Sequence, residues 1–307
     1  MTLNCATPID RPALSVIIPT RNRGSVIRRS VESALRSPRH DLEVVLVDDG
    51  STDDTVSRIS QLVDRRLLFH QLQSEGNANR ARNVGARLSH GSLIAFLDSD
   101  DVFGPNRIDR LIGFFSRWPN VDCLVDGYVE VSRGANHTHR MPHSTPSNTE
   151  IQKMLLAHLI PLTNSAITIR RSAFESVGGY DEAMPRHQDR ELLLRVARAH
   201  SIWFGDDTDV EKYRLARSIS HEYDGYIAGL DALVARHSDY QLPENSQIFR
   251  YLIVRGIIKA FITGHWPAAF RELRQWQRAQ HLPKDYFKCF LDYRKGARQR
   301  FLTQVKG

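Results

Sequence analysis

The stretch from Leu93 to Asp101 constrains most strongly what this chain can fold into. Five apolar residues, Leu-Ile-Ala-Phe-Leu, give way at once to Asp-Ser-Asp-Asp. The apolar run is too short for a helix and is typical of a fully buried central strand. In open α/β sheets, ligands bind beyond the carboxyl ends of the strands. We therefore expect Asp98, Asp100 and Asp101 to lie where such a fold binds its ligand.

Carboxylates this close together repel one another. At about 4 Å, two like charges cost about 1 kcal/mol in water and about 4 kcal/mol at an effective dielectric constant of 20. The acids therefore require a cation, a shared proton or open water. A simpler alternative is an acidic turn in which Asp100 or Asp101 caps the following helix.

The preceding segments indicate a parallel sheet with a second acidic strand end. Residues 14–19, 42–47 and 67–71 are predicted strands, and the second of them runs into Asp48 and Asp49. Helices are predicted between the strands, including one that starts at Asp53 or Asp54 and continues through Val63. Alternation of strands and helices at this spacing favours βαβ units, so both acidic strand ends lie on one edge of the sheet.

Several segments, in this order and spacing, resemble the motifs of family 2 glycosyltransferases. They are SVIIPTRNR at residues 15–23, VDDGSTD at 47–53, ARNVG at 81–85 and FLDSDD at 96–101. Later motifs of the family resemble GGYDE at 178–182 and QDRELLLR at 188–195, although the family usually has Glu-Asp where this chain has Gln188-Asp189. The resemblance covers roughly residues 14–220. It implies the GT-A fold, a Rossmann-like α/β fold with a mixed, mostly parallel sheet flanked by helices.

We expect the chain to divide at about residue 220. Residues 1–220 would form the GT-A domain, with a nucleotide half at about 12–131 and an acceptor half at about 150–220. The polar residues 132–148 between the halves are predicted to be a surface loop. Residues 221–307 would form a basic helical C-terminal extension, in which Arg255 and Lys259 interrupt any apolar window long enough to span a bilayer. Its amphipathic helices either pack on the domain or lie on a membrane surface.

The resemblance also implies roles for the acids. Asp100 is the expected direct ligand of Mn²⁺ or Mg²⁺ in a DXD motif, and Asp98 the expected contact to the ribose or the metal. Carboxylate oxygens are hard ligands that suit both ions. Asp189 is the expected catalytic base, although an aspartate before a helix is also an ordinary cap. His221 either completes the metal shell or is a surface histidine.

The other expected site residues bind the nucleotide sugar. By resemblance, Pro19, Thr20 and Arg21 line the nucleotide. Asp48 and Asp49 accept hydrogen bonds from the base or the ribose, or instead form an Asx turn before Gly50. Arg82 contacts the base or the phosphates, for which its guanidinium is suited, or is a solvated helix arginine.

The function implied is that of an inverting, metal-dependent, hexosyltransferase-like glycosyltransferase. It would move a sugar from a nucleotide diphosphate sugar, with UDP favoured, to a hydroxyl of a glycan or lipid-linked acceptor in bacterial-type surface polysaccharide assembly. The alternative is a non-catalytic GT-A domain that binds nucleotide or glycan in a polysaccharide-assembly complex. A dehydrogenase is disfavoured because no G-x-G-x-x-G follows the first strand.

Composition restricts partners and location. The net charge of +7 suits phosphorylated ligands, an anionic membrane surface or nucleic acid. Without a zinc-finger spacing or an aromatic-interleaved basic motif, nucleic acid is not an expected partner. Three scattered cysteines and the absence of a signal-peptide pattern favour the cytoplasm. Peripheral contact of the C-terminal helices with the inner face of an anionic membrane stays open.

Overall fold

The computed structural model describes residues 2–3, 12–73, 76–132, 135–142, 146–213 and 223–278. The chain forms two compact units. The first unit comprises residues 1–145, 161–183 and 188–216, and the second comprises residues 146–160, 184–187 and 217–307. The second unit thus includes two short segments from within the predicted acceptor half. The predicted division at residue 220 stays a prediction.

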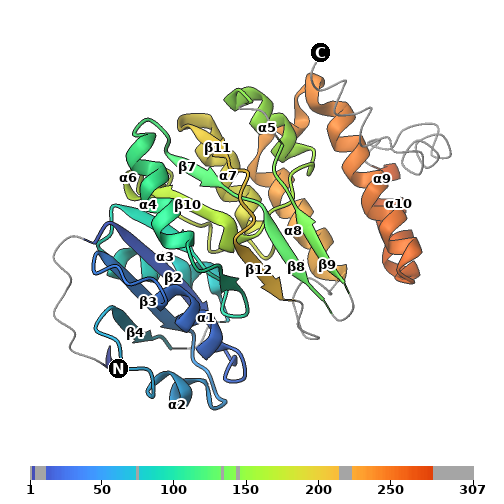
Figure 1. Ribbon diagram of the computed structural model, residues 1–307. Coiled ribbons are helices and arrows are strands. Elements are labelled where there is room, and N and C mark those ends of the chain that lie inside the picture. Colours follow the sequence, from blue (N-terminus) through green and yellow to red (C-terminus); the bar gives the residue numbers. More distant parts are fainter. Residues whose placement is uncertain are drawn as a thin grey trace. The chain divides into compact units, whose positions relative to one another are not determined.

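A mixed eight-stranded sheet forms the core of the first unit (Figure 1). In spatial order its strands are β1 (Thr2–Leu3), β4 (Leu67–Gln71), β3 (Leu42–Asp48), β2 (Leu14–Thr20), β5 (Leu93–Phe96), β10 (Ile167–Arg170), β7 (Cys123–Val125) and β11 (Ile202–Phe204). Strands β4, β3, β2 and β5 are parallel, whereas β10 runs antiparallel to both β5 and β7. The predicted α/β fold with a mostly parallel sheet is therefore confirmed.

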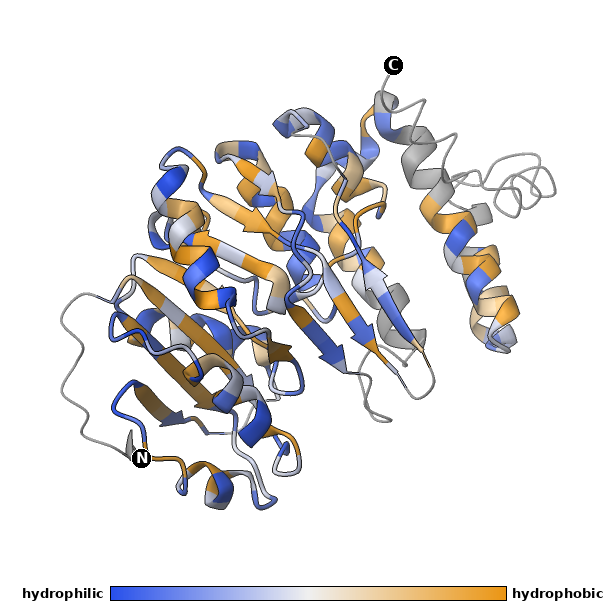
Figure 2. Cartoon of the chain, viewed as in Figure 1, coloured by the Kyte–Doolittle hydropathy of each residue, from blue (hydrophilic) through white to orange (hydrophobic). Residues whose placement is uncertain are grey.

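Helices cover both faces of the parallel strands. On one face, α1 (Ile27–Leu35), α2 (Thr55–Ile59) and α4 (Arg107–Arg117) enclose a core that includes Val44 and Leu46. On the other face, α3 (Ala78–Leu88) packs against Val45 and Val47. Since successive side chains of a strand point to opposite faces, a strand covered on both sides is mostly apolar along its whole length. Figure 2 accordingly shows these strands as mostly hydrophobic.

Helix α3 approaches the sheet closely because residue 85 is glycine. A Cβ atom at Gly85 would lie 2.5 Å from Cγ2 of Ile17, too close for any other residue without movement. The close approach brings the inner face of α3, which carries Arg82, next to the carboxyl ends of β2 and β5.

A smaller sheet of four strands corrects one prediction. Its order is β6 (Val102–Phe103), β12 (Val210–Tyr213), β8 (Tyr128–Val131) and β9 (Asn136–His139). Strand β9 pairs antiparallel with β8, so the prediction of a loop throughout residues 132–148 was wrong. The side chains of β9 are polar and mostly exposed, so backbone hydrogen bonds define the strand and the sequence gives no apolar alternation.

Two helix boundaries also differ from those predicted. Helix α2 ends at Ile59 and does not reach Val63, whose side chain is 94% exposed and has no core to join. Its start is held by Asp53, whose Oδ1 accepts from the backbone N–H of Thr55 at 3.0 Å. Asp189 lies inside the first turn of α7 (Gln188–Ala199) and not ahead of the helix.

The second unit is helical over its described residues. It contains α5 (Asn148–Leu156), α8 (Tyr223–Arg236), α9 (Ser246–Ile262) and α10 (Trp266–Arg278). Alanines 260, 268 and 269 form the buried contact between α9 and α10, and Val254, Ile257 and Ile258 of α9 are also buried. None of the described helices has the length and apolar character needed to cross a membrane.

Candidate active site

The parallel strands bring several predicted site residues to one edge of the sheet. Thr20, Asp48 and Gln71 end β2, β3 and β4 and are neighbours in register. The acidic turn at residues 98–101 follows β5, which is the next strand of the same sheet. The edge therefore collects polar side chains from four adjacent strands, as expected for a ligand site of this fold class.

The acidic turn has one inward and two outward carboxylates. Asp101 is 1% exposed, and its Oδ2 accepts from Oγ of Ser165 at 2.6 Å. The same Ser165 Oγ accepts from the backbone N–H of Asp98 at 3.0 Å. Asp98 and Asp100 are partly exposed. None of these acids caps α4, which begins at Arg107 after Asn106, so the plain-turn alternative does not account for them.

Asp98 is neutralised by Arg82. Nη2 of Arg82 donates to Oδ1 of Asp98 at 2.6 Å, and Nη1 donates to Oδ1 of Asn79 at 3.1 Å. The guanidinium is buried and lies 5.4 Å from the centroid of the Tyr180 ring. Burial lowers the pKa of Arg82, but the charge of Asp98 and of further acidic groups raises it, and the net shift is upward. Arg82 is therefore a buried cation of the site and not a solvated helix arginine.

Asp100 has no such partner. Its carboxylate takes part in no ion pair with the residues that the structure describes. Burial and the nearby charge of Asp98 raise its pKa, so the ionised form is disfavoured without a cation. Two hard carboxylates beside one another fit Mg²⁺ or Mn²⁺, which proteins often bind through one or two carboxylates together with substrate phosphates. Within the described ranges no three or more His, Cys, Asp or Glu side chains are grouped so that they could hold a metal ion together, and His221 lies outside these ranges.

Asp48 and Asp49 are turned inward. Asp48 is fully buried and accepts from the backbone N–H of Ser51 at 3.0 Å and from Nε2 of Gln71 at 3.3 Å. Oδ2 of Asp49 accepts from the backbone N–H of Asn77 at 2.6 Å. Both carboxylates thus bind the backbone of loops at the sheet edge. For Asp48, the bond from the N–H of Ser51 is the one expected if this residue forms a turn before Gly50. Their contact with a nucleotide stays a prediction.

The first strand contributes three predicted residues in different environments. Pro19 is buried within β2, and Oγ1 of Thr20 is buried without a hydrogen-bond partner among the described residues. Arg21 is exposed and lies against Gly76, where the backbone has a φ of +68° and a Cβ atom would come within 2.3 Å of Nη1. A buried hydroxyl without a partner and an exposed cation at the same strand end both suit a polar, anionic ligand.

Asp189 belongs to the same electrostatic neighbourhood. Its carboxylate is partly exposed, and Oδ1 accepts from the backbone N–H of Arg190 at 2.8 Å. Burial raises the pKa of Tyr180, and the charge of Asp189 contributes to the same upward shift. No described cation forms an ion pair with Asp189. A partly exposed carboxylate free of a salt bridge is suited to accept a proton.

Three asparagines link α3 to the loop that precedes Asp189 in sequence. Their side-chain amides donate to three consecutive backbone carbonyls. The bonds run from Asn83 to Tyr180 at 2.9 Å, from Asn79 to Asp181 at 3.0 Å, and from Asn77 to Glu182 at 2.8 Å. We call this set the asparagine ladder. It holds the aromatic ring of Tyr180 against Arg82 and so connects the loop to the acidic strand end.

Sequence reasoning missed Ser165, the asparagine ladder and Tyr180. Ser165 joins Asp98 and Asp101 but precedes β10, far from the acids in the sequence. Asn83 lies in the motif ARNVG and Tyr180 in the motif GGYDE, so the sequence marked both residues but did not indicate that they are in contact. Asn77 is the N-cap of α3 and Asn79 lies in its first turn, and nothing in the sequence indicated their contacts with residues 181 and 182.

The fold is that of the GT-A class. Residues 15–178, more than half of the chain, match the family model of glycosyl transferase family 2. The chain belongs to this family, as the sequence motifs predicted.

Proteins with a similar sequence are also named glycosyltransferases. An uncharacterized glycosyltransferase of Rickettsia felis is 28% identical over 200 residues, which are 64% of this chain and 33% of the relative. A pre-mycofactocin glycosyltransferase of Mycobacterium tuberculosis is 33% identical over 195 residues, which are 61% of this chain and 39% of the relative. The chain thus spans about a third of the length of the Rickettsia felis protein.

Solved structures share the fold. Residues 1–349 of S. aureus TarS in complex with UDP-GlcNAc superpose with a TM-score of 0.65 at 20% identity, covering 89% of this chain and 82% of that one. The mannosyltransferase PcManGT from Pyrobaculum calidifontis, in complex with GDP-Man and Mn²⁺, gives a TM-score of 0.56 at 18% identity, covering 97% and 87%. At these identities the likeness is one of fold.

Proposed function

We propose that this chain transfers a sugar, with inversion, from a nucleotide diphosphate sugar to a hydroxyl group of a glycan or lipid-linked acceptor. A UDP-sugar is the favoured donor. One observation carries the proposal: Asp98, Asp100 and Asp189 share one electrostatic site, and neither Asp100 nor Asp189 is ion-paired among the described residues. A carboxylate without an ion pair can bind a metal cation or accept a proton, and the proposed reaction requires one carboxylate for each purpose.

Donor binding would use the sheet edge. Asp98 and Asp100 would hold Mn²⁺ or Mg²⁺, which supplies positive charge to the diphosphate leaving group when bound. Thr20, Arg21, Asp48 and Asp49 would contact the nucleoside, with Arg82 nearby. The TarS structures with UDP-GlcNAc and UDP, and the mannosyltransferase structure with GDP-Man and Mn²⁺, support this use of the fold.

Asp189 would act as the general base. A sugar hydroxyl has a high pKa and attacks poorly unless its proton leaves as the new bond forms. The Asp189 carboxylate would accept that proton while the anomeric carbon passes from the diphosphate oxygen to the acceptor oxygen. A single displacement of this kind inverts the anomeric configuration. General-base assistance is typically worth about 10²–10⁴ in rate.

The acceptor and its location are proposed from the second unit and the relatives. The relatives named above are bacterial, which supports a role in bacterial-type surface polysaccharide assembly. On α9 and α10, apolar side chains are exposed beside the exposed cations Lys259, Arg271 and Arg274. The exposed apolar side chains are Phe261, Ile262, Trp266 and Phe270. Aromatic and basic side chains on one helix pair suit the surface of an anionic membrane, where a lipid-linked acceptor would be found.

A thermal-shift panel tests the proposed function. The protein is melted with UDP, GDP, other nucleotides and their sugars, each with and without Mn²⁺. A ligand present at about one hundred times its Kd adds about 2.7 kcal/mol to the free energy of unfolding. Stabilisation by one nucleotide diphosphate, increased by Mn²⁺, identifies the donor base. A protein stabilised by none of them contradicts the proposal, and binding without turnover favours the non-catalytic alternative.

A further inference from the structure

Lys212 lies on a strand that is hydrogen-bonded to the acidic turn. It occupies the third position of β12, and the backbone N–H of the next residue, Tyr213, donates to Oδ1 of Asp101 at 3.3 Å. At the same end of the strand, Arg29 stacks on the Tyr213 ring at 3.7 Å and donates to the backbone carbonyl of Asp100 at 3.1 Å. The strand that carries Lys212 is therefore attached to residues 100 and 101.

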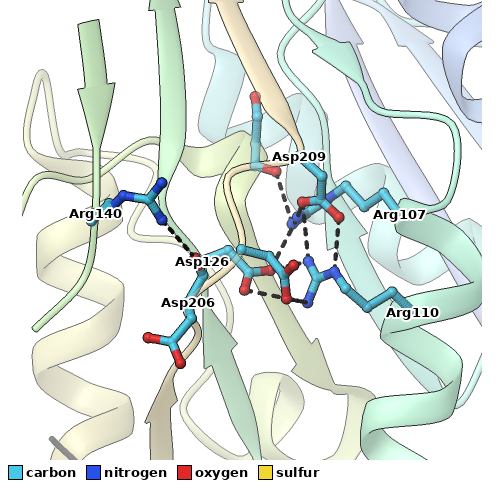
Figure 3. A network of polar contacts seen from close by, with 8 residues as sticks. Arg107, Arg110, Asp126, Arg140, Asp206 and Asp209 are labelled. Atoms are coloured by element: carbon cyan, nitrogen blue, oxygen red, sulfur yellow. Dashed lines mark hydrogen bonds and ion pairs between the residues drawn. The ribbon is translucent and has the colours of Figure 1, made fainter. Parts of the chain in front are cut away.

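A buried network of charges fixes the start of the same strand (Figure 3). Asp209, directly before β12, accepts from Nη1 of Arg107 at 2.5 Å and from Nε of Arg110 at 2.8 Å. Both arginines also bind Asp126, at 3.0 Å and 2.6 Å, and Arg107 and Asp126 are fully buried. Strand β12 is thus held at both ends, so the main chain of Lys212 has a defined position beside the acids.

The ammonium of Lys212 has no acceptor of its own. Nζ lies 5.5 Å from the centroid of the Tyr128 ring, and among the residues described it forms no hydrogen bond or ion pair. Burial lowers the pKa of Lys212, but the charges of Asp101, Tyr128, Asp98 and Asp189 raise it, and the net shift keeps the ammonium charged. A charged ammonium has three donors to satisfy, and the part of the chain that the structure describes offers it the face of the Tyr128 ring but no acceptor atom.

Asp101 does not need Lys212 as a direct partner. Its two oxygens accept from Oγ of Ser165 and from the N–H of Tyr213. The donors of Lys212 are therefore left for a ligand that is anionic, rich in acceptor oxygens and bound at the acidic turn to which β12 is attached. The diphosphate of the donor has this chemistry, and lysine binds phosphate as a compact point charge.

We propose that Lys212 donates to the diphosphate oxygens of the nucleotide sugar and holds them through the transfer. This inference rests on the proposed function. When the bond between the anomeric carbon and the β-phosphate oxygen breaks, its electron pair stays on that oxygen, and negative charge grows there. An ammonium fixed beside the oxygen stabilises that charge, while its own proton stays on Nζ.

Isothermal titration of UDP, UMP and uridine in the presence of Mn²⁺ tests the inference. A hydrogen bond to a charged group contributes about 1.5–3 kcal/mol, so Lys212→Met is expected to weaken UDP binding about 10- to 100-fold. Uridine, which lacks phosphate, should bind both proteins equally. Arg28→Met is the control, because it removes one exposed charge from an ion pair on α1 and should leave UDP affinity unchanged. Equal UDP affinity of Lys212→Met and the wild type overturns the inference.

A purely structural role of Lys212 is tested in a second background. If the lysine only balances the buried charge of Asp101, Lys212→Met should lose no UDP affinity once Asp101→Asn has removed that charge. The inference predicts instead that Lys212→Met/Asp101→Asn binds UDP about 10- to 100-fold more weakly than Asp101→Asn alone. The double variant also avoids an uncompensated buried carboxylate, which protects the fold. Wild-type protein that binds neither UDP nor GDP would overturn the proposed function itself, which is a different result.

Discussion

Arg82 bonds to Asp98 at 2.6 Å, whereas Asp100, two residues further on, has no ion-pair partner among the described residues. The protein therefore neutralises Asp98 with an arginine and leaves the charge of Asp100 without such a partner among the described residues. Burial and the charge of Asp98 both disfavour the ionised form of Asp100. A bound cation would therefore stabilise the Asp100 carboxylate more than that of Asp98, which already has an arginine. This asymmetry separates the expected effects of changing the two residues.

Replacing Asp100 by asparagine is expected to abolish the effect of Mn²⁺ on nucleotide binding and most of the turnover. The amide keeps the size of the carboxylate but loses the charge that binds a hard cation. Titration of UDP with Mn²⁺ and with EDTA measures the difference. Asp109→Asn, at an exposed acid on α4, is the control and should keep the wild-type response. Tighter UDP binding by Asp100→Asn with Mn²⁺ than with EDTA would show that Asp100 is not the ligand.

Replacing Asp189 by asparagine is expected to reduce turnover by about 10²–10⁴. Donor affinity should barely change, because a base contributes in the transition state and not in the binding of the donor. Steady-state kinetics give the turnover, and NMR of the product gives its anomeric configuration. Near-normal turnover would remove Asp189 from the mechanism. A product with retained configuration would overturn the inverting mechanism.

Replacing Arg107 by methionine is expected to lower the free energy of unfolding by about 3–5 kcal/mol, because it leaves buried Asp126 without one of its two arginines. Urea unfolding measures the loss. The control is Arg28→Met, which breaks an exposed pair with Glu32 and should cost no more than about 1 kcal/mol. Similar losses for both variants would contradict the assigned importance of the buried network.

The Asp64–Arg66 pair predicts a specific acid sensitivity. Hydrogen bonding from Arg66, at 2.8 Å, holds the pKa of Asp64 below its ordinary value. The stabilisation is therefore present above the unfolded-state pKa of about 3.9 and is lost as the pH falls through the lower folded-state pKa. The difference in unfolding free energy between wild type and Asp64→Asn should be constant from pH 7 to about 5 and shrink below about 4. A difference independent of pH down to 3 would refute the prediction.

The exposed face of α9 and α10 predicts salt-sensitive membrane binding. Each basic residue near an anionic surface contributes about 1 kcal/mol, and exposed aromatic side chains add apolar contact. Sedimentation with anionic vesicles at low salt should recover more wild-type protein than neutral vesicles do. Trp266→Ala/Phe270→Ala should recover less, and Val63→Ala, at an exposed residue of the first unit, should match the wild type. Equal recovery with neutral and anionic vesicles would contradict the predicted binding to anionic membranes.

The sequence predicted best those elements that are buried on both faces. Residues 14–19, 42–47 and 93–97 are almost entirely apolar because helices cover both sides of their strands, and such runs are visible without a structure. Strand β9 was missed because its polar side chains face outward and only its backbone pairs with β8. The antiparallel insertion of β10 between β5 and β7 has no sequence signal either, because its apolar residues would suit either direction.

The site was predicted in outline but not in its connections. Motifs located Asp98, Asp100 and Asp189, yet the partners that distinguish them come from distant segments. Arg82 on α3 and Ser165 before β10 reach the acidic turn only through the fold. Lys212 carries no motif, and its relation to the acids depends on the pairing of β12 with β6 and β8. Contacts of this kind are set by tertiary geometry, which spacing along one chain does not encode.

The bonds of the asparagine ladder end on backbone carbonyls, although Asn83 also donates to Oε1 of Glu182 at 2.9 Å. The ladder bond from Asn79 ends on the carbonyl of residue 181 and does not involve the Asp181 side chain, which accepts from the backbone N–H of Ala183 at 2.8 Å. The bond that ties this position to α3 is therefore separate from the identity of the side chain there. Variants at position 181 are expected to keep the ladder bond, which makes this one position a place where evolution, or an engineer, can vary the loop.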